Sequence, residues 1–93
     1  MRRVALAIGT EAVIELLGWL GAAMVIAAYA MVSYGAVHGR DRLYQSLNIT
    51  GALLLAVNTA RHGAWPSAAV NVIWALIAVG ALIPARARRR ETP

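Results

Sequence analysis

The sequence predicts an all-α membrane protein, with three transmembrane helices in a compact bundle. Hydrophobic residues make up 60% of the chain and charged residues only 14%, whereas soluble domains are nearer half apolar and about a quarter charged. The basic residues are all arginine, and they stand at the ends of the chain or in two short breaks. Between the breaks lie long stretches with almost no ionisable group, which is typical of integral membrane proteins.

The first apolar stretch follows a short basic segment, residues 1–10. Its start resembles a signal peptide, but the apolar character continues through MVIAAYAMV, far beyond any cleavage site. We therefore expect a retained helix over about residues 11–35, with Thr10 as its N-cap. Gly35, Gly39 and the charges around them are expected to end this helix.

A second helix is expected over about residues 43–61 and a third over about residues 66–83. Gly63 supplies a stop for the second helix, because glycine readily adopts the left-handed conformation that often follows a helix. Pro66 fits the first turn of the third helix, where its missing N–H costs nothing. A helix of about 18 residues is roughly 27 Å long, enough to cross a hydrocarbon core.

These helices form one transmembrane domain, residues 11–84, followed by an arginine-rich tail, residues 85–93. Three crossings place the first loop and the tail on the same side of the membrane. Cytoplasmic flanks of membrane helices carry an excess of basic residues. We therefore expect an integral membrane protein with its N-terminus outside and its C-terminus in the cytoplasm. The arginines interpreted as topogenic are Arg40, Arg42, Arg86, Arg88, Arg89 and Arg90, against Arg2, Arg3 and Arg61 on the other side.

The net charge of +5 also raises the alternative of a nucleic-acid partner. No basic residue shares an amphipathic face with aromatic side chains that could stack on bases, so this partner is not expected. The lipid bilayer is the expected partner, since arginines beside apolar spans meet anionic headgroups.

Polar side chains inside the expected spans recur at helical spacing, so they share one face of each helix. An unpaired amide or carboxyl in a membrane is costly, and these faces should therefore turn inward. Two interpretations stay open for Asn48, Asn58, Asn71 and Trp74: they fasten helices or protomers together, or they line a cavity that holds a ligand. The three faces comprise Glu15, Gly18, Ala22 and Tyr29; Asn48, Gly51, Leu55, Asn58 and His62; and Asn71, Trp74 and Ala78.

The start of the first helix and the end of the second lie on the same side of the membrane. Arg61 and His62 therefore come near Glu11 and Glu15, and we expect an interhelical ion pair between Glu15 and Arg61. A proton relay through Glu15 is the alternative, but no second buried carboxylate continues such a path.

No catalytic set is evident in the sequence. Ser33, Ser46 and Ser67 lack an obvious base and orienting acid, and the two histidines fall at opposite membrane faces. The chain has no cysteine and no glycine-rich phosphate loop. We expect neither an enzyme nor a bound cofactor or metal.

The stretches LYQSLNITGALLLAVN and HGAWPSAAVNVIWALIA carry a resemblance to a family of proteins. Over about residues 13–83 the chain resembles a family of short, uncharacterised bacterial three-helix membrane proteins. This resemblance implies the fold and a location in the bacterial inner membrane, and it brings no activity with it.

A second resemblance is to the SemiSWEETs, half-size sugar transporters of the PQ-loop group that work as homodimers around a central cavity. Pro66 followed five positions later by Asn71 is similar to their third-helix proline and pocket asparagine. Gly18 and Ala23 fall near small residues of their first helix. The chain lacks the Pro-Gln hinge of that group, and Leu55 stands near the place of its second-helix tryptophan.

Self-association as a homodimer is expected, because three thin helices bury their polar faces better against a second copy. Two functions remain open on this basis. One is a structural or accessory membrane component, and the other is a SemiSWEET-like small-solute transporter with an amide-lined cavity at the dimer axis.

Overall fold

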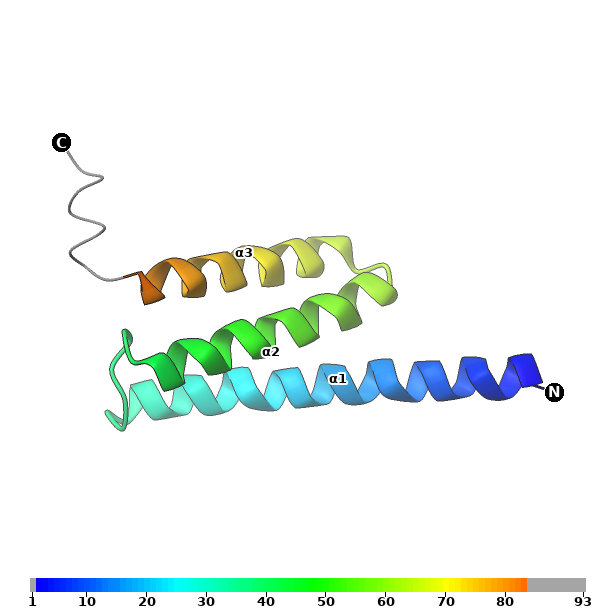
Figure 1. Cartoon of the computed structure of the whole chain (residues 1–93), viewed down its shortest axis with the longest axis horizontal. Helices are drawn as coiled ribbons and strands as arrows, with labels where there is room; N and C mark the ends of the chain where they lie inside the picture. The colour runs from blue at the N-terminus through cyan, green and yellow to red at the C-terminus, as the bar shows by residue number, and fades with distance from the viewer. Residues whose placement is uncertain (1, 84–93) are drawn as a thin grey trace.

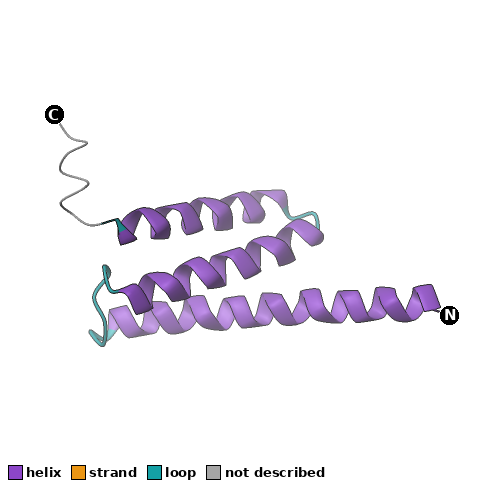
Figure 2. Ribbon diagram, viewed as in Figure 1, coloured by secondary structure: helices purple, strands orange, loops and turns teal. Residues whose placement is uncertain are grey.

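The computed structural model describes residues 2–83, which fold into three α-helices joined by two short connections (Figures 1 and 2). Helix α1 spans Arg2–Ser33, α2 spans Arg42–Arg61 and α3 spans Trp65–Leu82. The expected arginine-rich tail, residues 85–93, lies outside the described residues. Four of the arginines interpreted as topogenic lie there with it, namely Arg86, Arg88, Arg89 and Arg90.

Helix α2 lies in the middle, packed against α1 on one side and against α3 on the other (Figure 1). Helices α1 and α3 do not pack on each other within the described part of the chain. The three helices therefore form a single layer, with overall extents of 60 × 31 × 19 Å. The prediction of an all-α bundle of three helices is confirmed, and the central position belongs to α2.

Among the three described helices, α1 and α3 are long and apolar enough to cross a membrane, and α2 is less apolar. The 20 residues of α2 extend over about 30 Å. This helix is therefore long enough to cross a membrane, and it differs from the other two in being less apolar. Gln45, Asn48 and Asn58 interrupt its otherwise aliphatic sequence. Length and composition thus support two of the three expected spans.

Helix α1 begins at Arg2 and not near Glu11, so the prediction of Thr10 as an N-cap is wrong. The hydroxyl of Thr10 instead donates to the carbonyl oxygen of Leu6, one turn earlier, at 2.8 Å. Arginine, alanine and leucine in this segment are strong helix formers, and a lone Gly9 costs only about 1 kcal/mol relative to alanine. A capping residue does not start a helix where the residues before it already favour helix.

Both connections begin with the same glycine-based stop. Gly35 and Gly63 have φ of 76° and 73°, a region that residues with a Cβ rarely adopt. After each glycine, the next residue donates its backbone N–H to the carbonyl five positions earlier, at 2.8 Å. This bond satisfies a carbonyl that the end of the helix leaves free. The predicted stops are confirmed, and Pro66 lies in the first turn of α3 as expected.

The residues buried within the layer are small or carry an amide, and no large side chain is fully buried among residues 2–83. Large apolar side chains lie outside instead, as the exposed fractions of Leu16 (67%), Ile26 (66%) and Leu76 (65%) illustrate. This pattern is the reverse of a soluble core. The buried residues are Gly18, Gly21, Ala28, Gln45, Asn48, Gly51, Ala52, Ala68, Ala75 and Ala78.

Candidate functional site

The contact between α1 and α2 is closest where two glycines meet. A Cβ placed on Gly21 would lie 2.7 Å from the carbonyl oxygen of Gly51, and one placed on Gly51 would lie 2.9 Å from that of Gly21. Neither position accepts a side chain unless the backbones move apart. Sequence reasoning identified Gly51 but missed Gly21, although Gly18 and Gly21 stand three positions apart and so share a helix face.

Asn58 fastens α2 to α1 beside this glycine contact. Its Nδ2 donates to the backbone carbonyl oxygen of Ile14 at 2.9 Å. Gly18 makes room for the amide, because a Cβ there would lie 2.5 Å from Asn58 Nδ2. The Oδ1 atom of Asn58 takes part in no hydrogen bond within residues 2–83.

Asn48 fastens α2 to α3 and is almost fully buried, with 4% of its surface exposed. Its Oδ1 accepts the indole N–H of Trp74 at 3.1 Å, and its Nδ2 donates to the carbonyl oxygen of Tyr44 at 3.0 Å. Gln45, also buried, donates to the carbonyl oxygen of Gly39 and so ties the first connection to α2. Sequence reasoning missed Gln45, although it stands three positions before Asn48.

Asn71 is half-buried on α3, at helical spacing between the buried Ala68 and Ala75. No side-chain hydrogen bond found within residues 2–83 involves it, in contrast to Asn48 and Asn58. The three asparagines therefore do not share one site. One joins α2 to α3, one joins α2 to α1, and the third is available for another partner.

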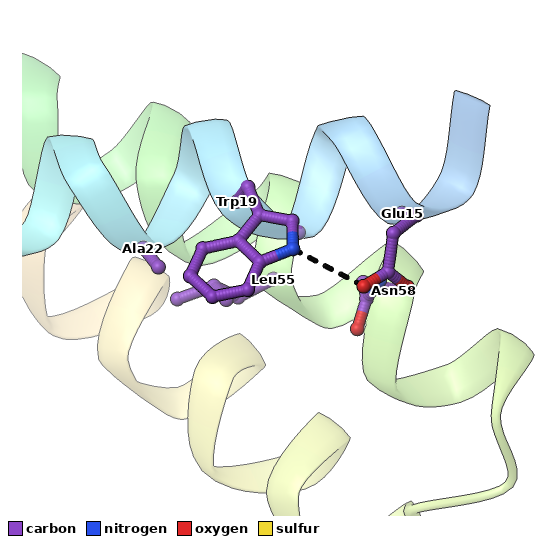
Figure 3. Close-up of a pocket in the computed structure, with 6 residues that line it drawn as sticks. Glu15, Trp19, Ala22, Leu55 and Asn58 are labelled. Carbon is purple, nitrogen blue, oxygen red and sulfur yellow. Dashed lines mark hydrogen bonds between the residues drawn. The ribbon is translucent and has the colours of Figure 1, made fainter. Parts of the chain in front are cut away.

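The predicted ion pair between Glu15 and Arg61 is wrong in its acidic partner. Arg61 donates instead to Glu11, with an N–O distance of 2.8 Å, and about half of each side chain is exposed. Glu15 accepts the indole N–H of Trp19 at 3.1 Å, within α1 (Figure 3). The two carboxylates are one turn apart on the same face, and the crossing of α1 over α2 brings the earlier one to Arg61.

Two hollows open on one face of the layer. One has a volume of about 230 Å³ and lies between α1 and α2, and the other has about 190 Å³ and lies between α2 and α3. The first hollow includes Leu55 of α2, and the second includes Tyr44 and Asn48. The spacing of these three residues places them on one face of α2, so both hollows open on that face. The first hollow is lined by Glu15, Gly18, Trp19, Ala22, Leu55 and Asn58, and the second by Tyr44, Gln45, Asn48, Trp74, Ile77 and Ala78.

A third hollow, of about 590 Å³, is entirely apolar. Its α2 residues, Ala56, Val57 and Ala60, lie on a different side of that helix from the polar stripe. The two smaller hollows therefore include amide side chains and the Glu15 carboxylate, whereas the third is lined by aliphatic and aromatic side chains. From α3 this hollow takes Trp65, Ala68, Ala69, Val72 and Ile73.

Within the described residues, no group of three His, Asp or Glu side chains is placed to hold a metal ion. The chain belongs to an uncharacterised protein family, whose model matches residues 14–90. That region includes both asparagine contacts and begins at Ile14, whose carbonyl oxygen accepts from Asn58, so Glu11 of the ion pair with Arg61 lies just before it. Neither the curated proteins nor the solved structures include a match to this chain.

Proposed function

We propose that this chain is an integral membrane protein and a structural or accessory component of the membrane. The observation that carries the proposal is the inverted exposure of the helices, with large apolar side chains outside and alanines, glycines and amides inside. In water, so large an apolar surface promotes association. In a bilayer, hydrocarbon solvates that surface, and helices associate through close contacts of small residues and through hydrogen bonds.

The proposal includes α2 as a third crossing, although it is the least apolar helix. Its place between two apolar helices goes with burial of Gln45 and Asn48, and both Asn48 and Asn58 have partners on a neighbouring helix. Arg42 is the first residue of α2 and Arg61 is the last. The length between them, about 30 Å, matches the thickness of a hydrocarbon core.

For orientation we propose an N-terminus outside and a C-terminus in the cytoplasm of a bacterial inner membrane, from the distribution of arginine along the sequence. A second copy of the chain is the proposed protein partner. Asn71 supports this assembly, because an amide with no partner in residues 2–83 is stabilised in a bilayer when it pairs across an interface. The proposal assigns no catalysis and no cofactor to the chain.

Single cysteines test the three crossings directly, because the natural chain contains none. Ala36→Cys marks the connection between α1 and α2, and Ala64→Cys marks the connection between α2 and α3. In sealed right-side-out vesicles, an impermeant maleimide should label Ala64→Cys at once and Ala36→Cys only after the vesicles are opened. Labelling of both cysteines from one side would show that α2 does not cross, whereas the reverse order would overturn only the orientation.

A second candidate function is small-solute transport by a homodimer. It is favoured by the two hollows on one face of the layer, since Asn48 and Trp74 line one and Asn58 lines the other. A second copy facing this surface would enclose both hollows. Labelled glucose should then enter proteoliposomes faster than protein-free liposomes, and Trp74→Ala should slow its entry. Equal uptake in all three preparations would exclude glucose transport and leave the structural role.

A further inference from the structure

The carboxylate of Glu15 has no cationic partner within residues 2–83. Arg61 pairs with Glu11, and within the described residues Glu15 has one side-chain hydrogen bond, which its Oε1 accepts from Trp19. Glu15 lies one turn beyond Glu11, about 6 Å further along α1. If α1 crosses the bilayer as proposed above, this position is inside the hydrocarbon core, where an unpaired carboxylate is costly.

Glu15 opens into the hollow of about 230 Å³ between α1 and α2. In Figure 3, Glu15 and Asn58 both lie toward the indole N–H end of Trp19, and Ala22 lies toward the other end of the ring. Two oxygen acceptors remain free there within the described part of the chain: the second carboxylate oxygen of Glu15 and the Oδ1 of Asn58. Ala22 and Leu55 supply apolar walls.

We propose that this hollow binds a small organic ammonium ion that carries an apolar group. The Glu15 carboxylate selects a positively charged ligand that donates N–H bonds, because charge-assisted hydrogen bonds are the strong ones, and Asn58 Oδ1 offers a second acceptor beside it. The apolar group of the ligand packs on the walls and along the indole ring, as in most small-molecule sites. Hard metal ions such as Ca²⁺ take six or more oxygen ligands, which two oxygens do not provide.

The inference rests on the proposed membrane placement of α1, and the experiment separates the two. Benzylammonium chloride is titrated into the full chain in lipid nanodiscs, and the indole ¹⁵N–¹H signal of Trp19 is followed by NMR. Trp19→Phe assigns this signal. Benzyl alcohol, which has the same ring without the charge, is the matched control ligand.

Saturable movement of the Trp19 signal with benzylammonium is the expected result, together with a much weaker response to benzyl alcohol. Glu15→Gln should weaken binding by at least about tenfold, since it removes the charge and keeps the size of the side chain. Glu11→Gln is the matched control variant, because it removes a carboxylate one turn away that faces Arg61, and its affinity should stay within about twofold of the natural chain.

Three outcomes overturn the proposal: no saturable movement in the natural chain, equal affinity of Glu15→Gln, or equal responses to the ammonium and the alcohol. The last would reflect partition of an aromatic ring alone. Carbonate extraction of native membranes is run alongside. If carbonate releases the chain but benzylammonium binding is saturable and depends on Glu15, the membrane proposal is refuted and the binding site stands. If carbonate leaves the chain in the membrane but benzylammonium does not bind, the binding site is refuted and the membrane proposal stands.

Discussion

The contact of α2 with α1 and its contact with α3 use different chemistry. Against α1, the main chains meet at Gly21 and Gly51, and Asn58 bonds to a backbone carbonyl. Against α3, alanines such as Ala75 fill the seam, and the hydrogen bond joins two side chains, Trp74 and Asn48. The contact with α1 therefore depends on the absence of a Cβ at Gly21 and Gly51, and the contact with α3 depends on the hydrogen bond between Trp74 and Asn48.

This difference teaches that each contact fails in its own way. A glycine contact is lost when atoms are added, because the Cβ has no room. A side-chain hydrogen bond is lost when atoms are removed, and from either partner equally. Helix α2 thus packs on α1 through close approach of the two backbones and on α3 through a side-chain hydrogen bond.

The largest effect is expected at the glycine contact. Gly21→Ala should lower the free energy of unfolding by about 1–3 kcal/mol, because its Cβ would press on the backbone of Gly51. Unfolding by SDS titration in mixed micelles measures the loss. Gly80→Ala is the matched control, since nothing lies within 4 Å of its Cβ, and it should be neutral or stabilising by up to about 1 kcal/mol. Equal stability of the two variants would contradict the glycine contact.

The contact with α3 should show coupling between its two partners. Asn48→Ala and Trp74→Phe each remove the indole–amide bond, so the double variant should lose less stability than the sum of the single variants. The expected coupling is about 0.6 kcal/mol, the average for hydrogen bonds between membrane helices, and at most about 1.7 kcal/mol. Trp65→Phe serves as control, since Trp65 is largely exposed, and it should show no coupling with Asn48→Ala. Strict additivity at Asn48 and Trp74 would rule out the bond.

Asn58→Ala separates the two contacts. It should cost about 0.5–1.5 kcal/mol through loss of the bond to Ile14. Its effect should add to that of Trp74→Phe within about 0.5 kcal/mol, because Asn58 and Asn48 stand about 15 Å apart along α2. The same SDS titration tests this, and a large departure from additivity would mean that the two contacts form one unit.

The smallest effect is expected from the pair of Glu11 and Arg61. About half of each side chain is exposed, so Glu11→Gln or Arg61→Gln should cost at most about 1 kcal/mol, and less at high salt. Thermal unfolding in a nonionic detergent at two salt concentrations measures this. The charge-swapped double variant should recover the loss, and failure to recover would show that the pair does not stabilise the fold.

The sequence predicts the helices and their stops well, because these depend on local chemistry. Gly35 and Gly63 provide the left-handed residue that a helix end requires, and Pro66 fits only the first turn. The start of α1 is missed, because Thr10 resembles a cap although the segment before it favours helix.

The inward face of α1 is harder to predict. In the stripe expected from Glu15 to Tyr29, Gly18 packs against Asn58 of α2, but Tyr29 is 71% exposed. Gly21 and Ala28, which lie outside the stripe, are buried. Hydrophobic periodicity gives no direction in a helix that is apolar on every side. The choice between Glu11 and Glu15 as the partner of Arg61 fails for a related reason, since both lie on one face and the crossing of the helices decides between them.

Spin-label accessibility along α3 tests the central claim most directly, which is that large side chains face lipid while small residues and amides face protein. Single cysteines at Ala75, Leu76, Ile77 and Ala78 are labelled and measured in liposomes with oxygen and with a water-soluble nickel complex. High oxygen and low nickel access at Leu76 and Ile77, with low access to both at Ala75 and Ala78, is the predicted result. Nickel access at Leu76 and Ile77 as high as at a labelled Ala36 in opened vesicles would contradict it.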